Sequence, residues 1–205
     1  MMSSHYFSAE PTAEHQPREL RVTLAGEDRL LTTDSGIFSP DGIDKGTAIL
    51  LAEAPAPAAR GNLLDVGCGW GPIALSLALL SPEASVYAVD VNERALGLTR
   101  KNAEALSLSN LHAELPDRID SALRFQTIWS NPPIRVGKEV LHRILEQWLP
   151  RLAPGGKAYL VVQKNLGSDS LQRWLQERFK ANDFAVRRYA TAKSFRILEI
   201  TSPES

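Results

Sequence analysis

Residues 63–71 read Leu63-Leu64-Asp65-Val66-Gly67-Cys68-Gly69-Trp70-Gly71, which is an apolar run followed by three glycines at alternate positions. The apolar run is typical of a buried strand, and residues 72–80 continue with the pattern of a helix. Glycines at a strand-to-helix turn let the backbone approach a ligand closely at the carboxyl end of a parallel sheet. The stretch therefore predicts the first crossover of an α/β fold and a ligand site at its turn.

Strand-like and helix-like segments alternate from this stretch to the C-terminus. The expected strands are 62–66, 85–91, a weak one near 111, 127–130, 158–163, 185–189 and 195–200, and the expected helices are 72–80, 93–106, 138–152 and 169–180. A turn at 154–156 should separate the third helix from the next strand. This order predicts a mostly parallel, seven-stranded α/β sheet with helices on both faces, and an antiparallel edge strand from the closing pair.

The chain divides into three segments by composition. Residues 1–18 are rich in Ser, Pro, Glu and His without a period, and we expect a flexible arm there. Residues 19–60 predict a β-hairpin and a short helix over 46–54, both part of the same domain as the core. Residues 61–205 form that core.

Composition excludes several classes of protein. The chain has 205 residues, 43% of them hydrophobic, and its 23 basic and 24 acidic side chains leave a net charge of −1. Global charge therefore does not indicate nucleic-acid binding, and a basic patch would have to be local. The single cysteine, Cys68, excludes an internal disulfide. Without a signal peptide, a membrane-spanning run or a Cys/His metal motif, we expect a cytoplasmic protein that binds no metal.

Two acidic residues favour one kind of nucleotide cofactor. The glycine spacing is G-x-G-x-G rather than the G-x-G-x-x-G of dinucleotide binders, and Asp65 precedes the first glycine by two residues. Asp65 would repel a pyrophosphate and attract a cationic amino-acid group. Asp90 ends the next strand, where an acid can bind ribose hydroxyls. The pattern favours S-adenosylmethionine (SAM) over NAD; the alternative is a tight turn beside an acid of another nucleotide-binding class.

The segment Asn131-Pro132-Pro133-Ile134 follows the strand 127–130. Each proline fixes its own φ, and the residue before a proline is held extended. The amide oxygen of Asn131 and the carbonyl of Pro132 can then point into one cleft as two converging acceptors, which suit an amino group on a planar system. The alternative is a proline-rich loop after a strand.

These motifs in this order resemble class I methyltransferases of the small-domain (MTS) group. Two more stretches are similar to the single-domain RsmC-like members, which are 16S rRNA guanine-N2 methyltransferases: residues 32–39 with 44–47, and residues 131–138. The resemblance covers about residues 20–200. It implies a Rossmann-like class I methyltransferase fold, SAM as cofactor, and ribosomal RNA or the small ribosomal subunit as partner.

The resemblance also implies roles for particular residues. The residues that it assigns to the cofactor are Asp65, Gly67, Gly69, Gly71, Asp90, Asn92, Asp117, Phe38, Asp44, Gly46 and Thr47. The first four would surround the methionine part, Asp90 would bind the ribose, and Asn92 and Asp117 would face the adenine. Asp117 is alternatively a surface acid, and the last four are alternatively a hydrophobic staple and helix start.

The catalytic segment would be Asn131, Pro132, Pro133 and Ile134, with Arg135 and Lys138 on the phosphates of a flipped nucleotide. The alternative for this basic pair is a solvated helix start. Relatives that act on adenine or glutamine, and many that act on guanine, have an aromatic residue in place of Ile134. Its absence removes a stacking face worth roughly 1–3 kcal/mol per base. The resemblance covers only the catalytic domain of the two-domain enzymes, so we expect no counterpart of their extra N-terminal domain. Gln163 and Lys164 are further candidates for contact with the substrate.

The expected function is methyl transfer from SAM to an exocyclic amine, with guanine N2 of 16S rRNA as the target. One alternative is methylation of a protein glutamine or of a small planar amide, which the same Asn-Pro-Pro chemistry serves. Another is a non-catalytic module with this fold. Degenerate modules of that kind lose their glycines or their Asn-Pro-Pro, and this chain keeps both.

Overall fold

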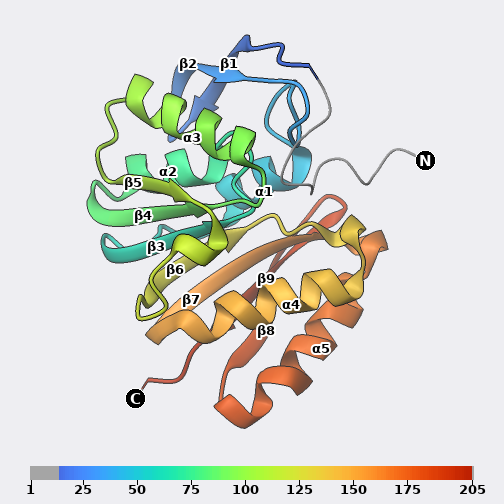
Figure 1. The fold of residues 1–205 in the computed structure, drawn as a ribbon. Helices are drawn as coiled ribbons and strands as arrows, with labels where there is room; N and C mark the ends of the chain where they lie inside the picture. Colours follow the sequence, from blue (N-terminus) through green and yellow to red (C-terminus); the bar gives the residue numbers. More distant parts are fainter. Residues whose placement is uncertain (1–13, 205) are drawn as a thin grey trace.

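A seven-stranded sheet in the order β5-β4-β3-β6-β7-β9-β8 forms the centre of the protein in a computed structural model that describes residues 14–204 (Figure 1). The strands are β3 (Arg60–Val66), β4 (Glu83–Val89), β5 (Leu111–Glu114), β6 (Phe125–Ser130), β7 (Leu152–Gln163), β8 (Ala185–Ala192) and β9 (Phe195–Thr201). Neighbours from β5 to β7 are parallel, and β9 is antiparallel to both β7 and β8. The prediction of a mostly parallel seven-stranded sheet is confirmed, and the antiparallel strand lies one place in from the edge.

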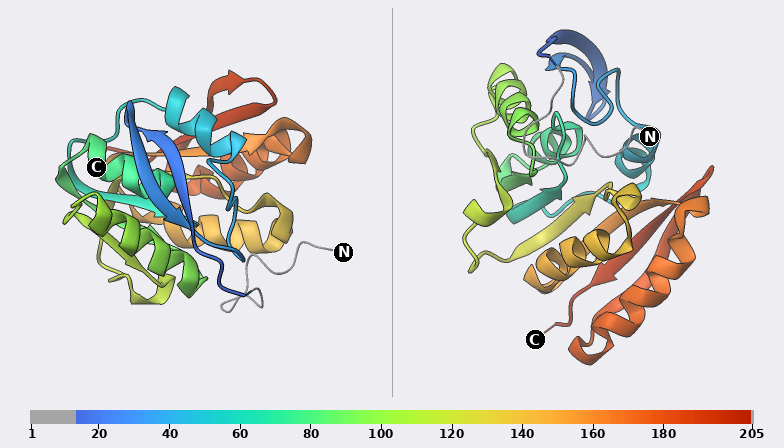
Figure 2. Two further views of the ribbon diagram at one scale, coloured as in Figure 1. Left: turned by 90° about the horizontal axis from the view of Figure 1, so that it is seen from above. Right: turned by 45° about the vertical axis from the view of Figure 1, so that its right-hand side comes forward.

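Helices cover both faces of the sheet (Figure 2). The helices α1 (Lys45–Glu53), α2 (Pro72–Leu80) and α3 (Glu93–Ala105) lie on one face, and α4 (Lys138–Trp148) and α5 (Ser168–Phe179) lie on the other. Helix α4 is amphipathic, since Leu141, Leu145 and Trp148 recur at the spacing of one helix face and pack in the core. Each face of the sheet is therefore closed by its own apolar layer.

The N-terminal hairpin of β1 (Arg18–Leu24) and β2 (Glu27–Thr33) packs against α2 and α3. The side chain of Asn102 on α3 accepts a hydrogen bond from the Thr32 N–H (2.7 Å) and donates to the carbonyls of Thr32 (2.8 Å) and Trp70 (3.0 Å). One buried amide thus joins the hairpin to the segment after β3. Of the predicted arm over residues 1–18, residues 1–13 lie outside the described part of the chain.

Two segments differ from the sequence-based prediction. The helix expected over 138–152 ends at Trp148, and a 3₁₀ turn over Leu149–Arg151 follows because Pro150 cannot donate to a continuing helix. The turn expected at 154–156 is instead an irregularity inside β7, whose pairing with β6 shifts there. A Cβ on Gly156 would lie 2.8 Å from the carbonyl oxygens of Ala153 and Phe125, so only glycine fits this close approach.

The carboxyl ends of the central strands bring the two motifs together. Strands β3 and β6 are adjacent and parallel, with Asp65 opposite Trp129, so the glycine turn and Asn131 leave the sheet side by side. Because β9 runs in reverse, it is its first residue, Phe195, that reaches the same edge, where it pairs with Gln163. Between residues 14 and 204, no helix combines the length and the apolar character needed to cross a membrane.

Candidate active site

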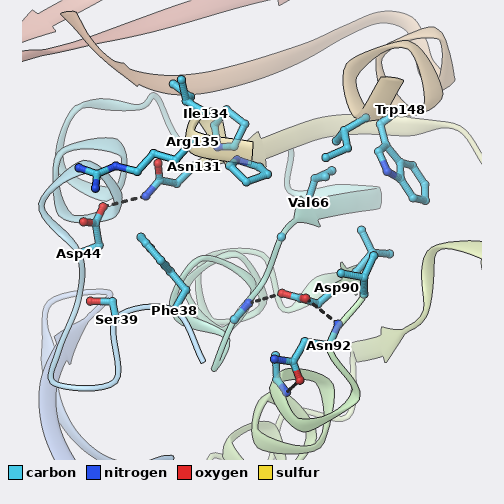
Figure 3. Close-up of a pocket in the computed structure, with 18 of the residues that line it drawn as sticks. Phe38, Ser39, Asp44, Val66, Asp90, Asn92, Asn131, Ile134, Arg135 and Trp148 are labelled. Atoms are coloured by element: carbon cyan, nitrogen blue, oxygen red, sulfur yellow. Dashed lines mark hydrogen bonds between the residues drawn. The ribbon is translucent and has the colours of Figure 1, made fainter. Parts of the chain in front are cut away.

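A cavity of about 590 Å³ opens at this edge of the sheet (Figure 3). Its walls come from the loop before α1, the turn after β3, the end of β4, the Asn-Pro-Pro segment, α4, and the adjoining ends of β7 and β9. The volume lies within the range of small-molecule sites in proteins. The cavity therefore has room for a cofactor and part of a substrate.

The glycine turn presents bare backbone to this cavity. Gly67 and Gly69 line it with φ values of +81° and +57°. A Cβ at Gly67 would meet no atom within 4 Å, and one at Gly69 would meet only the Phe38 carbonyl, at 4.0 Å. Any side chain here would adopt a strained backbone and occupy the space that the two glycines leave open.

Asp65 and Gly71 lie behind the turn rather than on the cavity. Asp65 is fully buried; its Oδ2 accepts a hydrogen bond from the Ala74 N–H (3.0 Å), and its Oδ1 has no partner among the described residues. Burial raises the pKa of this carboxyl well above its usual value, and the charge of Asp90 raises it further. Gly71 precedes α2 with a φ of +100°, and its Cβ position lies 3.0 Å from Thr99 Oγ1. Both residues therefore support the turn from the side that faces away from the cavity.

Asp90 presents a carboxylate to the cavity and also braces the turn (Figure 3). Its Oδ2 accepts from the Gly69 N–H (3.0 Å) and its Oδ1 from the Asn92 N–H (2.9 Å). Burial raises its pKa, although these backbone hydrogen bonds act in the opposite direction. Hydroxyl donors, which stabilise the charged form, are therefore suitable ligands for Asp90.

Asn92 lines the cavity, and both polar atoms of its side chain make hydrogen bonds that hold the local structure. Its Oδ1 caps α3 by accepting from the N–H groups of Arg94 (3.0 Å) and Ala95 (3.3 Å). Its Nδ2 donates to the Gly36 carbonyl (3.3 Å) in the loop before α1.

Asp117 does not reach the cavity, contrary to the expectation that it faces the adenine. It is exposed within a single 3₁₀ turn, Pro116–Arg118, that follows β5. Pro116 supplies the lining of the cavity at this point. The turn directs its proline inward and leaves the acid in solvent.

The residues present fit SAM, whose nucleoside and amino-acid parts need different surroundings. Apolar side chains of Phe38, Val91, Ala95 and Pro116 lie beside the Asp90 carboxylate, and the open backbone of the glycine turn lies next to them. Phe38, which is 47% exposed, presents apolar surface to the cavity. Among residues 14–204, no three His, Cys, Asp or Glu side chains converge to hold a metal ion.

Asn131 is held at its amide nitrogen. Its Nδ2 donates to Asp44 Oδ2 at 2.8 Å (Figure 3). It also donates to Thr47 Oγ1 at 3.1 Å, so both N–H bonds are used. Its Oδ1 has no hydrogen-bond partner within residues 14–204, and the residue lines the cavity. Asn131 thus offers a free acceptor in a fixed orientation.

The Pro132 carbonyl is not the free acceptor that the sequence predicts. It already accepts from the Ile134 N–H (2.8 Å), because Pro133 at φ −75° and ψ 76° closes an inverse γ-turn. A carbonyl oxygen has two lone pairs, so one remains for a ligand. The γ-turn fixes the direction of that remaining lone pair.

The residues after the prolines divide between the cavity and the surface. Ile134 lines the cavity while packing on the apolar core, and exposed Arg135 lines it as well. Lys138 is exposed at the start of α4, outside the lining. Gln163 lines the cavity, whereas its neighbour Lys164 does not.

Sequence reasoning missed the aromatic walls of the cavity. Trp148 at the end of α4 and Phe195 at the start of β9 both contribute to the lining. Trp148 is 2% exposed and packs in the core, and Phe195 carries no local motif. Only the pairing of β9 with β7 brings Phe195 to this edge.

The doubly wound sheet, the open glycine turn and the acid after the next strand define a class I methyltransferase fold. The chain belongs to the methyltransferase small domain family, whose model matches residues 28–199. The methyl donor of class I methyltransferases is SAM, so the cofactor prediction is confirmed at the level of this class.

Comparison with known proteins gives relatives of two kinds. The chain is 39% identical over 181 residues to the uncharacterized protein YbxB of Bacillus subtilis (strain 168), covering 87% of this chain and 90% of that protein. It is 32% identical over 146 residues to ribosomal RNA small subunit methyltransferase C of Photorhabdus laumondii, covering 66% of this chain and 41% of that one. The chain spans 33% to 52% of the length of the methyltransferase C relatives that it matches.

One solved structure is similar over nearly the whole chain. It is the T. thermophilus 16S rRNA N2 G1207 methyltransferase (RsmC) in complex with AdoMet and guanosine, with a TM-score of 0.74, 24% identity, and coverage of 96% of this chain and 53% of that one. At that identity the similarity shows the fold.

Proposed function

We propose that this protein transfers a methyl group from SAM to guanine N2 of 16S ribosomal RNA. The observation that carries the proposal is the free Asn131 Oδ1, held in place beside the glycine turn. Supporting evidence comes from the family and from the relatives named as 16S or small-subunit rRNA methyltransferases. The identity of the base is the part of the proposal that depends on those relatives.

The protein's task is to make a weak nucleophile react. The exocyclic amine of guanine is a poor nucleophile because its lone pair is delocalised into the ring. Asn131 Oδ1 and the remaining lone pair of the Pro132 carbonyl accept its two N–H bonds and direct the nitrogen lone pair toward the methyl donor. Alignment and fixed dipoles supply most of the acceleration, so no strong base is needed.

When bound, SAM would supply an electrophilic sulfonium methyl group and a neutral thioether as leaving group. The methylated amine is then positively charged and loses one of its two protons to water. Asn131 Oδ1 and the Pro132 carbonyl each hold one N–H until this loss, and the N–H that remains keeps its single acceptor. The carboxylate of Asp90 accepts ribose hydroxyls and keeps the donor in place at the other end of the cavity.

The substrate side of the cavity is apolar. Its walls are Ile134, Ile144, Trp148, Leu166 and Phe195. Ile134 has no aromatic ring on which a base could stack. The half-exposed ring of Phe195, which lines the same cavity, supplies an aromatic surface instead. Gln163, whose amide has no hydrogen-bond partner within the described chain, offers a donor and an acceptor to the edge of the base.

The test is transfer of labelled methyl from SAM to small ribosomal subunits that lack the modification, followed by nucleoside mass spectrometry of the 16S rRNA. We expect N2-methylguanosine with the wild-type protein and none with Asn131→Ala. Label on protein alone, or a different methylated nucleoside, contradicts the proposed substrate.

A further inference from the structure

We infer that Asp44 and Thr47 are positioning residues that orient the Asn131 amide and strengthen its acceptor oxygen. This inference rests on the proposed function and deepens it. The family resemblance assigns both residues to the cofactor, whereas their hydrogen bonds lead to the catalytic segment. We name this set of three side chains, Asp44, Thr47 and Asn131, the amide clamp.

The clamp is built on the first turn of α1. Asp44 is the N-cap of that helix, and its Oδ2 accepts from the N–H groups of Gly46 (2.8 Å) and Thr47 (3.3 Å). The same oxygen accepts from Asn131 Nδ2 at 2.8 Å. A single carboxylate oxygen therefore joins the start of a helix to a residue 87 positions later in the chain.

The packing around the clamp leaves little space for another arrangement. A Cβ on Gly46 would lie 3.0 Å from Asp44 Oδ2, 3.1 Å from Phe195 Cε1 and 3.3 Å from Asn131 Nδ2. These distances are shorter than ordinary van der Waals contacts. The glycine thus lets α1 approach the catalytic segment closely enough for Asp44 and Thr47 to reach Asn131.

The chemistry of an amide gives the clamp its consequence. An amide presents two donors on one side and an acceptor on the other, and Asp44 and Thr47 offer oxygen acceptors to the donor side. A flipped amide would direct its oxygen at the Asp44 carboxylate, which carries no proton to donate. The clamp therefore admits one orientation, with Oδ1 on the side of the cavity.

The charge of Asp44 adds to this orientation effect. A hydrogen bond to an ionised acceptor is about twice as strong as one between neutral groups. Successive hydrogen bonds through one amide polarise each other, so a carboxylate on the N–H side makes Oδ1 a better acceptor. Asp44 thus acts on the amine through Asn131, without touching it.

The first experiment is a matched pair at position 47, assayed on the small subunit. Thr47→Ser keeps the hydroxyl and Thr47→Val removes it at nearly the same size. We expect Thr47→Val to lower kcat about tenfold, the loss that corresponds to one hydrogen bond, with the Kd for SAM within about twofold and Thr47→Ser close to wild type. An unchanged kcat with a raised Kd for SAM would assign Thr47 to the cofactor and overturn the inference.

The second pair separates helix capping from the clamp at position 44. Asparagine and serine are both good N-caps, but only asparagine has the reach of aspartate. We expect Asp44→Asn to lower kcat about fivefold through loss of charge and Asp44→Ser to lower it about 30-fold, with similar melting temperatures. Equal kcat values for the wild type and Asp44→Ser would overturn the inference.

A third measurement distinguishes failure of the clamp from failure of the proposed function. The side-chain amide protons of Asn131, assigned in ¹H–¹⁵N spectra by their loss in Asn131→Ala, need no substrate. We expect slow solvent exchange in the wild type and at least tenfold faster exchange in Thr47→Val. Fast exchange in the wild type would overturn the clamp whatever the substrate, whereas an inactive wild type with slow exchange would overturn the proposed function alone.

Discussion

The two halves of the cavity differ in how their polar groups are held. On the glycine-turn side, Asp90 and Asn92 are bound to backbone N–H groups of their own or a neighbouring turn. On the side of α4, β7 and β9 the walls are mostly apolar, and the side-chain amides of Gln147 and Gln163 have no hydrogen-bond partner within residues 14–204. The first half is preorganised for one ligand, and the second leaves its polar groups free.

This difference separates the part of the site that is common to the fold from the part that selects a substrate. The cofactor does not change from one substrate to another. The protein groups that bind it can therefore be fixed by the turns that form the sheet edge. Function on a shared fold depends on the residues grafted at the site. In the proposed function, Asn131 lies at the boundary between the halves, where the methyl group would pass from cofactor to substrate.

The largest expected effect is at that boundary. Asn131→Ala removes the acceptor that directs the amine, and we expect kcat to fall about 100-fold or more, since loss of one preorganised hydrogen-bonding group has this size. The Kd for SAM should stay within about threefold of wild type, as measured by isothermal titration calorimetry. Activity near wild type would mean that Asn131 is not the acceptor, and loss of SAM binding would place it in the cofactor half.

The cofactor half can be tested at Asp90. Asp90→Ala removes the carboxylate that faces the cavity, and we expect the Kd for SAM to rise about 10- to 100-fold, the size of a charged hydrogen bond. Asp117→Ala is the matched control, because that acid is exposed outside the cavity. Equal losses of SAM affinity in the two variants would contradict the position that we give to Asp117.

Substitutions in the glycine turn should change the free energy of unfolding and the affinity for SAM to different extents. Gly71→Ala places a Cβ 3.0 Å from Thr99 Oγ1 at a φ of +100°, and we expect it to lower the free energy of unfolding by about 2 kcal/mol. Gly67→Ala has open space at a φ of +81°, so its strain should cost about 1 kcal/mol while SAM affinity falls. Chemical denaturation and calorimetry measure the two quantities, and the reverse ranking of stability would contradict this account.

We expect a weaker effect from a substitution at Gln163, in the substrate half of the cavity. We expect Gln163→Leu to raise the KM for the RNA substrate about fivefold through loss of one neutral hydrogen bond, with the Kd for SAM unchanged. Asn165→Ala is a nearby exposed control outside the cavity. A change in the affinity for SAM instead of the KM for RNA would assign Gln163 to the cofactor half of the cavity.

The smallest expected effect is at Asp34, which follows β2 and begins the loop before α1. Burial by itself would raise the pKa of Asp34, but hydrogen bonds from His15, Gln16 and Ser35 outweigh it and the pKa is lowered. A lowered pKa in the folded state stabilises the protein above the unfolded value of 3.8, and this contribution is lost as the pH falls through the folded value. We expect Asp34→Asn to remove about 1 kcal/mol of this pH-dependent stability. Denaturation curves between pH 5 and about pH 2.5 measure it, and identical pH slopes would contradict the assignment.

The sequence predicts the two halves unequally well. Gly67, Gly69, Asp90 and Asn131 follow from short motifs at strand ends, because a parallel sheet places such ends along one edge. Phe195 could not be found in this way, since its position depends on a long-range pairing between β9 and β7. The link from Asp44 to Asn131 spans 87 residues and is likewise invisible to local patterns.

Two local details differ from the sequence-based expectation for reasons of backbone geometry. Pro132 was expected to offer a free carbonyl, but the residues after it close a γ-turn onto that oxygen. Asp117 was expected at the cavity, but the short 3₁₀ turn after β5 presents Pro116 there instead. Turn geometry of this kind depends on ψ angles, which residue identity only partly restricts.

The reversed direction of β9 has a consequence for the evolution and engineering of this site. The connection between β8 and β9 consists of Lys193 and Ser194 and opens at the same edge as the cavity. Residues inserted into a hairpin connection lengthen it at small cost without changing the register of its strands. New substrate-recognising segments can therefore be added beside Phe195 while the seven strands, the glycine turn and Asn131 keep their places.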